Sequence, residues 1–332
     1  MRTGAVRFTS PRKVELVEVD VPAPAPGEVL VRTLFSGISS GTEMLAYRGE
    51  IDPDSSLDES ISSLSGSFRY PFAYGYSCVG VVMESRGALE RGAMVFAFHP
   101  HQGAFVTGEQ DVVTIDGIDA RAATLFPHVE TALQVSLDAG PVIHETVVVM
   151  GLGAVGLLSA ALLARSGARV LCAEPDSRRR DAAERFGLRC VEPADVPELV
   201  LQETDGEGAA LLVEATGNPS ALSEGLDLLA QEGTALVVSW YGIKPVSLPL
   251  GGRFHRRRLT IRSTQVTTIP ARLRASWSIE RRRRVAAGLL RELPVGVLAT
   301  HTFPLDQAAS AFAAVDRGAE GLIHAALSYE GE

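Results

Sequence analysis

The sequence predicts an α/β protein with two domains, a β-rich domain and a doubly wound parallel sheet. The first 121 residues hold short runs rich in Val and Leu, separated by Pro and Gly, a pattern typical of strands and turns. From residue 122 onward, strand-like and helix-like runs alternate, as they do in βαβ units. The chain of 332 residues, 46% of them hydrophobic, is long enough to bury two cores.

The composition narrows the classes of function. The net charge of −9 disfavours nucleic-acid binding, because an acidic surface repels phosphate backbones. The first residues lack the apolar core of a signal peptide, and no apolar run is long enough to cross a bilayer. The three cysteines, Cys78, Cys172 and Cys190, suit neither a disulfide framework nor a four-cysteine zinc lobe. We expect a cytoplasmic protein that acts on a small molecule and binds neither nucleic acid nor membrane.

Strands dominate the expected first domain. Residues 51–68 interrupt them with a Ser- and Asp-rich run, which predicts a mobile surface loop. The Pro- and Gly-rich residues 22–27 form a turn between the first two strands. The strands are expected at residues 14–21, 28–35, 79–83, 93–98 and 112–115.

The second domain is expected to begin with a helix at residues 122–139, bent at Pro127. We expect residues 1–121 and 269–332 to form the first domain and residues 122–268 the second. Strands are then expected at residues 146–150, 169–173, near 190, 210–214, 234–239, 259–263 and 322–327, and helices at residues 154–166, 177–186, 219–230, 278–290 and 305–317.

The motif with the clearest chemistry is Gly151-Leu152-Gly153-Ala154-Val155-Gly156, which follows an apolar strand and opens a helix. In a dinucleotide site, the first glycine permits the tight turn, the second leaves room for the pyrophosphate, and the third lets helix and sheet approach. The helix N-terminus offers unpaired N–H groups and partial positive charge to the phosphates. The next strand ends at Glu174, where a carboxylate can accept hydrogen bonds from ribose hydroxyls.

Glu174 favours NAD over NADP, because a carboxylate there repels the 2′-phosphate of NADP. The arginines at residues 178–180 leave NADP open, since a guanidinium can bind that phosphate. A solvated first helical turn would also explain them. The expected cofactor-binding residues are Gly151, Gly153, Ala154, Val155, Gly156, Glu174, Arg179, Thr216 and Thr131.

The order of a β-rich domain, a dinucleotide fold and a return segment resembles the medium-chain dehydrogenase/reductase superfamily over nearly the whole chain. The resemblance implies a GroES-like catalytic domain and a Rossmann cofactor domain, with the active site in a cleft between them. It also implies a possible homodimer through the edge of the Rossmann sheet, near residues 240–250.

The resemblance breaks at the family's zinc ligands. The position of the family's ligand cysteine is occupied by Ser39 or Ser40, and Tyr76 replaces the ligand histidine. The third ligand position falls at Phe126 or Pro127. Hydroxyl and phenol groups are poor ligands for Zn²⁺, so the sequence predicts an enzyme without catalytic zinc.

The N-terminal motifs look most like those of the bacteriochlorophyllide a dehydrogenases within this superfamily. The motifs are residues 36–43, Ser-Gly-Ile-Ser-Ser-Gly-Thr-Glu, and the later pair Gly75-Tyr76. This likeness implies a zinc-free dehydrogenase acting on a secondary alcohol, and it is confined to the N-terminal region.

Without zinc, hydrogen-bond donors must stabilise the developing alkoxide. Thr42 matches the family's proton-relay hydroxyl, and Tyr76 is expected to act as acid or base through a lowered pKa. His128 suits proton exchange near neutral pH, and Glu130 would orient it if the helix bends. The catalytic candidates are therefore Thr42, Tyr76, His128 and Glu130.

The other charged and titratable residues are expected to lie on the surface or to play structural roles. His99 and His101 are expected to be surface residues, although they share a strand face that could line a pocket. The arginine-rich runs at residues 255–258 and 281–284 are expected to be solvated, with phosphate or acidic-substrate binding as the alternative. Glu43 is expected to fix its loop.

The expected function is interconversion of an alcohol and a carbonyl with NAD(P) by hydride transfer. Two alternatives remain: a zinc-free, NADPH-dependent quinone or enoyl reductase, and a non-catalytic nucleotide-binding protein. A metal site rebuilt from His99, His101, His128 or Glu130 is a third hypothesis.

Overall fold

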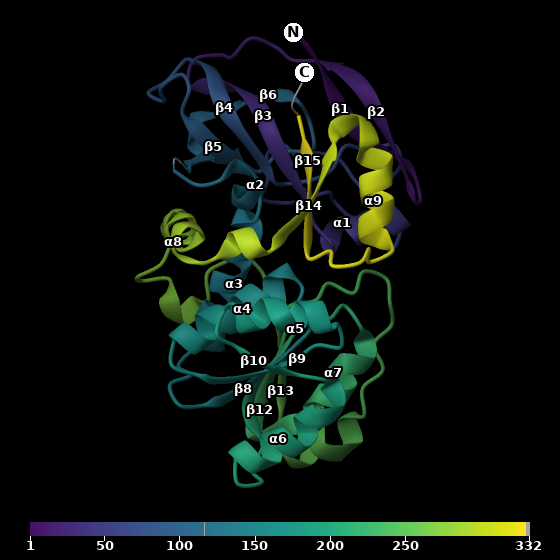
Figure 1. The fold of residues 1–332 in the computed structure, drawn as a ribbon, viewed down its shortest axis with the longest axis vertical. Coiled ribbons are helices and arrows are strands. Elements are labelled where there is room, and N and C mark those ends of the chain that lie inside the picture. The colour runs from purple at the N-terminus through teal and green to yellow at the C-terminus, as the bar shows by residue number, and fades with distance from the viewer. Residues whose placement is uncertain (116, 330–332) are drawn as a thin grey trace. The chain divides into compact units, whose positions relative to one another are not determined.

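The computed structural model describes residues 1–115 and 117–329 and divides them into two compact units. The first unit combines Met1–Pro127 with the chain from residue 283 onward, and the second is His128–Arg282 (Figure 1). The domain limits expected from the sequence, after residues 121 and 268, stay a prediction. Within the described residues, no helix is both long enough and apolar enough to cross a membrane.

The second unit is built on a six-stranded sheet in which every paired strand is parallel. The first strand along the chain lies in the middle, beside the fourth, so the strand order reverses there. Open parallel sheets bind ligands at the carboxyl ends of the strands around such a reversal. The sheet order is β10 (Arg189–Val191), β9 (Arg169–Ala173), β8 (Thr146–Met150), β11 (Ala209–Glu214), β12 (Leu229–Val237) and β13 (Thr260–Ser263).

Helices lie on both faces of this sheet (Figure 1). The strands expected in this part are confirmed, but the helix expected at residues 219–230 ends early, because the chain enters β12 at Leu229. A helix that the sequence did not predict, α6, buries Val196 and Val200 against the sheet. The helices are α4 (Ala154–Arg165), α5 (Ser177–Glu184), α6 (Val196–Glu203) and α7 (Pro219–Gly225).

The single bent helix expected at residues 122–139 is wrong. The chain forms two helices, α2 (Ala120–Ala123) and α3 (Phe126–Ala139). The Asp119 side chain accepts a hydrogen bond from the backbone N–H of Ala122 and begins the first of them. Pro127 lies in the first turn of α3, where a missing N–H costs nothing, so it begins a helix instead of bending one.

The first unit holds a larger sheet that is antiparallel except where β14 runs parallel to β15. β3 pairs with β15, β4 and β6, and β1 and β2 form a separate hairpin. The sequence did not predict β1, β6 or α1. The bounds are β1 (Arg2–Ser10), β2 (Lys13–Asp20), β3 (Glu28–Ile38), β4 (Cys78–Ser85), β5 (Met94–Ala97), β6 (Ala104–Gly108), β7 (Val112–Thr114), β14 (Ala299–Pro304) and β15 (His324–Ser328), with α1 (Thr42–Arg48), α8 (Ile279–Glu292) and α9 (Ala308–Asp316).

The surface loop expected at residues 51–68 is anchored in the core. Leu57, Leu64 and Phe68 are all buried and belong to the main hydrophobic cluster of the first unit. The Phe68 ring packs edge-on against Phe72, with centroids 5.6 Å apart. Polar composition predicted a solvated segment, but three buried apolar side chains hold it down.

Candidate active site

The glycine-rich turn leaves β8 in a geometry that requires its glycines. Gly151 has φ +87, and a Cβ there would lie 2.9 Å from the backbone of Ala215. A Cβ on Gly156 would lie 1.9 Å from the carbonyl oxygen of Gly151. A Cβ on Gly153 would meet no atom within 4 Å. The turn therefore has one open side, at the N-terminus of α4, and this arrangement fits the pyrophosphate of a dinucleotide.

Glu174, at the end of β9, stabilises this turn through hydrogen bonds to its backbone. One carboxylate oxygen accepts the N–H of Leu152 at 2.7 Å, and the other accepts the N–H of Asp176 at 3.0 Å. The side chain is almost completely buried. The sequence indicated a ribose contact but not this second role, in which the carboxylate fixes the backbone that faces the phosphates.

The arginines after Glu174 are placed differently from one another. Arg180 donates to the carbonyl oxygens of Glu174 and Pro175, at 2.9 and 2.7 Å, and to the Glu192 carboxylate at 3.0 Å. A guanidinium nitrogen of Arg179 lies 3.9 Å from a carboxylate oxygen of Glu174. Arg179 is therefore the arginine beside the expected ribose position, and Arg180 supports the loop.

A second buried carboxylate lies at the end of the neighbouring strand β11. Glu214 accepts the backbone N–H of Thr216 at 2.7 Å and its hydroxyl at 2.5 Å, and it accepts the Tyr241 hydroxyl at 2.6 Å. Burial and the bond to Glu214 raise the pKa of Tyr241. Thr216 is thereby fixed at the carboxyl edge of the sheet. Sequence reasoning missed Glu214, although an acidic residue that ends an apolar strand was a visible signal.

Arg282 is fully buried, so the expectation that all of residues 281–284 are solvated is wrong. Its Nε and Nη2 atoms lie 3.1 and 3.0 Å from Oε1 of Glu130, Nη1 donates to Gln134 at 2.6 Å, and Nη2 donates to the Val266 carbonyl at 2.5 Å. Helical spacing explains the burial, because the residues four and eight places after Arg282 in α8 are buried too. Arg282 therefore holds Glu130 in an ion pair, and a catalytic role for Glu130 stays a prediction.

His128 and Thr131 lie on α3, where His128 is buried and Thr131 is partly exposed. Burial disfavours the charged imidazole and lowers the pKa of His128 to about 4, so the expectation that it titrates near neutral pH is wrong. At neutral pH the ring is therefore uncharged and keeps one nitrogen able to accept a proton.

Two of the expected catalytic hydroxyls meet in the first unit. Thr42 begins α1, and the side chains of Thr42 and Ser39 lie near enough to the Tyr76 hydroxyl to lower its pKa slightly. Burial raises the pKa of Tyr76, with a smaller contribution from the Glu43 carboxylate, so the expected lowered pKa is wrong. The phenol keeps its proton at neutral pH and can serve as a hydrogen-bond donor.

The expectation that His101 is a surface residue is also wrong, because it has no exposed surface. Its Nε2 lies 2.7 Å from Oε2 of Glu43, and its Nδ1 lies 2.6 Å from the Ser36 hydroxyl. The N–H of Val6 donates to the His101 carbonyl, so the backbone at His101 is hydrogen-bonded to β1, a strand that the sequence did not predict. His99 is half-buried and stacks on Phe105, with ring centroids 4.0 Å apart.

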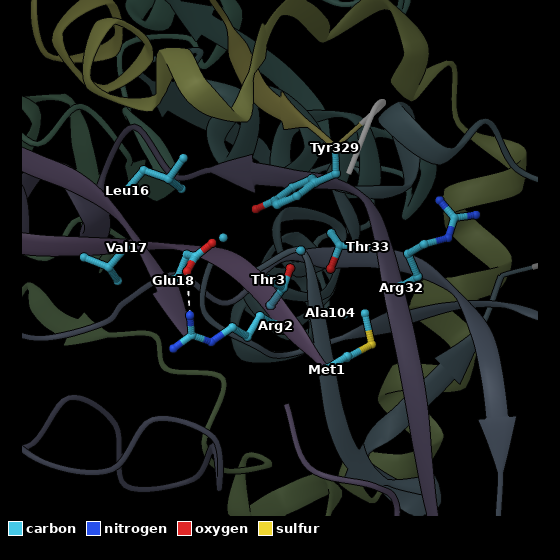
Figure 2. Close-up of a pocket in the computed structure, with 12 residues that line it drawn as sticks. Met1, Arg2, Thr3, Leu16, Val17, Glu18, Arg32, Thr33, Ala104 and Tyr329 are labelled. Atoms are coloured by element: carbon cyan, nitrogen blue, oxygen red, sulfur yellow. Dashed lines mark hydrogen bonds and ion pairs between the residues drawn. The ribbon is translucent and has the colours of Figure 1, made fainter. Parts of the chain in front are cut away.

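A pocket of about 430 Å³ lies in the first unit beside the β1–β2 hairpin (Figure 2). Arg2, Glu18, Arg32 and Tyr329 are among the residues that line it. Of the described residues that line this pocket, none is an expected catalytic or cofactor-binding residue.

Known proteins resemble this chain in sequence and in fold. A family described as "Zinc-binding dehydrogenase" matches residues 154–279. The L-threonine 3-dehydrogenase of Pyrococcus furiosus is 29% identical over 77% of this chain and 81% of its own length. The 2-desacetyl-2-hydroxyethyl bacteriochlorophyllide A dehydrogenase of Cereibacter sphaeroides is 28% identical over 94% of both chains, so the expectation that this likeness is confined to the N-terminal region is wrong. The structure of 2R,3R-butanediol dehydrogenase from Bacillus subtilis superposes with a TM-score of 0.78, at 18% identity over 98% of this chain and 99% of that one.

In sequence and in fold the chain is similar to the medium-chain dehydrogenases/reductases. It is an NAD(P)-dependent oxidoreductase. The predicted fold, a GroES-like β-rich part with a Rossmann sheet, is confirmed.

The superfamily's zinc ion does not fit the side chains present at its ligand positions. The Phe126 ring packs on Phe96, with centroids 4.5 Å apart, and offers no donor atom. Tyr76 holds its proton, and Ser39 offers a neutral hydroxyl, which Zn²⁺ binds poorly. Among residues 1–115 and 117–329, no group of three or more His, Cys, Asp or Glu side chains is placed to hold a metal.

We predict that burial of His128 makes stability depend on pH. Its pKa is about 4 in the folded state and about 6.5 in the unfolded chain, so acid favours unfolding as the pH falls from 6.5 toward 4. Over that range the wild type should lose roughly 3 kcal/mol more free energy of unfolding than His128→Gln. Urea titrations at several pH values measure this difference.

The exposed His255 supplies the control, and His255→Gln should follow the wild type. Parallel loss of stability in the wild type and His128→Gln would show that His128 is not a buried neutral imidazole.

Proposed function

We propose that this enzyme interconverts a secondary alcohol and a ketone with NAD(H), by hydride transfer without catalytic zinc. What supports the proposal is the Tyr76–Thr42 pair: the sequence resemblance assigns both residues to positions at or beside the superfamily's zinc ligands, and burial keeps Tyr76 protonated. Protonated hydroxyls can stabilise a developing alkoxide by hydrogen bonding.

Each residue then has a defined task. The nicotinamide ring supplies or accepts the hydride when the cofactor is bound. The turn at Gly151, Gly153 and Gly156 binds the pyrophosphate through backbone N–H groups, and Glu174 accepts the ribose hydroxyls. Tyr76 and Thr42 orient the substrate oxygen.

Proton exchange follows from the protonation states. In the direction of carbonyl reduction, the Tyr76 phenol donates its hydrogen bond to the oxygen that becomes an alkoxide, and gives it a proton. His128 is the second candidate for proton exchange; its imidazole is uncharged at neutral pH, and the lowered pKa makes it a weak base. In alcohol oxidation Tyr76 first releases its proton to solvent and then accepts the proton of the substrate hydroxyl.

The relatives support the substrate class. The Pyrococcus furiosus enzyme is named for dehydrogenation at position 3 of L-threonine, a secondary alcohol. A screen of secondary alcohols and ketones with NAD⁺ and NADH tests the proposed function directly, by the absorbance of NADH.

Glu174 should make the protein prefer NAD(H) over NADP(H). We expect NADH to bind at least about tenfold more tightly in calorimetric titrations, because the buried carboxylate repels a 2′-phosphate at close range. Glu174→Gln keeps an acceptor oxygen for the Leu152 N–H and should narrow the preference. Glu184→Gln, at the exposed end of α5, should leave it unchanged. Tighter binding of NADPH by the wild type would mean that Arg179 dominates the site and would favour a quinone or enoyl reductase.

Removing the Tyr76 hydroxyl should slow turnover. Tyr76→Phe should lower kcat by at least about tenfold with cofactor affinity nearly unchanged, the pattern of a lost transition-state interaction. Tyr70→Phe is the matched control, since the Tyr70 hydroxyl bonds only the Ala46 carbonyl among the bonds described for it. If Tyr76→Phe, Thr42→Val and His128→Ala all keep wild-type kcat, the proton does not travel through these residues.

A further inference from the structure

Glu43 ties the loop before α1 to His101. Oε1 of Glu43 accepts the backbone N–H of Ser39 at 2.9 Å, and Oε2 accepts from Nε2 of His101 at 2.7 Å. Glu43 and His101 have no exposed surface. Since Thr42 directly precedes Glu43 in α1, the orientation of this carboxylate sets where the loop carries the Thr42 hydroxyl.

The same imidazole supports the segment that carries Tyr76. Gly75 has φ +116, and a Cβ there would lie 2.7 Å from Cδ2 of His101 and 2.8 Å from Nε2. The His101 ring therefore packs directly against the backbone of the residue before Tyr76. One side chain thus contacts both segments whose hydroxyl groups meet, one through Glu43 and the other through Gly75.

A chain of hydrogen bonds fixes the tautomer and orientation of His101. A carboxylate only accepts, so Nε2 of His101 carries the hydrogen toward ionised Glu43. In a neutral ring Nδ1 accepts from the Ser36 hydroxyl at 2.6 Å, and Ser36 in turn accepts from the Tyr329 hydroxyl at 2.8 Å. The Phe312 ring meets the imidazole edge-on, with centroids 5.7 Å apart, and shields it.

The far end of this chain of hydrogen bonds lies at the wall of a pocket. Tyr329 lines the pocket beside the β1–β2 hairpin (Figure 2), so the bonds run from that pocket to the catalytic loop. All donors in the chain point toward Glu43, which gives the buried carboxylate a defined set of partners.

We propose that His101 is a positioning residue for the hydride-transfer reaction, holding the hydroxyls of Thr42 and Tyr76 in one arrangement through Glu43 and Gly75. The inference rests on the proposed function. His101 touches neither substrate nor cofactor in it, and it acts by fixing two backbone segments. A displacement of about 1 Å in such groups can cost about a hundredfold in rate, so loss of this support should reach kcat.

Two substitutions separate the hydrogen bond from the packing. His101→Phe keeps a ring against Gly75 and Phe312 but removes the donor to Glu43. His101→Gln keeps an N–H donor near the Nε2 position. We expect His101→Phe to lower kcat at least about tenfold with the Kd for NADH within about twofold of wild type, and His101→Gln to recover most of the loss. His99→Phe is the control, since His99 stacks on Phe105 and bonds the Pro100 carbonyl.

A spectroscopic measurement needs no substrate. In protein containing isotope-labelled histidine, the His101 side chain should give the NMR signature of the Nε2–H tautomer, with a strongly deshielded proton bound to Nε2. The resonance is assigned by its absence in His101→Gln, and it should shift in Glu43→Gln. If His101→Phe does not fold, Ser36→Ala, which removes the bond to Nδ1, tests the support of His101 through its effect on kcat.

The outcomes distinguish the two claims. Absence of turnover by the wild type across the substrate screen contradicts the proposed function and leaves the NMR result to judge the His101 geometry. Turnover by the wild type with an unchanged kcat in His101→Phe overturns the positioning role alone. An Nδ1–H tautomer at His101 overturns it as well.

Discussion

Burial of the Glu43 carboxylate is the constraint on which the proposed catalytic region depends. An ionised carboxylate without exposed surface is costly unless hydrogen bonds satisfy it. The Ser39 N–H and the His101 imidazole meet that requirement, and in doing so they fix the loop, the start of α1 and the histidine itself. The same negative charge contributes to the raised pKa of Tyr76, so one buried group influences both the geometry and the protonation of the site.

The cofactor domain uses the same physical device. Glu174 ends β9 and Glu214 ends β11, and each buried carboxylate accepts backbone N–H groups from the loop beside it. These bonds hold the turn around Gly151 and the turn around Thr216 at the edge of the sheet where the strand order reverses. Rigid loops at that edge bind a dinucleotide with less loss of conformational entropy than mobile loops would.

The sequence predicted the Rossmann half well because its signals are local. Runs such as Thr146–Met150 are apolar throughout, and parallel strands buried on both faces have that composition. The glycine spacing likewise reports a backbone requirement at each position. The β-rich half was harder, since β1 is partly exposed and the short strand β6 gains its stability from β3, a partner distant in sequence. The burial of His101 and Arg282 was not predicted either, because it depends on contacts with residues distant in sequence.

In the proposed mechanism, protonated hydroxyl groups take the place of the metal ion that related dehydrogenases use. The most direct measurement is elemental analysis of the purified, dialysed enzyme, combined with its turnover of a secondary alcohol before and after treatment with a zinc chelator. We expect zinc far below one ion per chain and turnover that the chelator does not change. One zinc ion per chain that survives dialysis, with turnover lost on chelation, would contradict it.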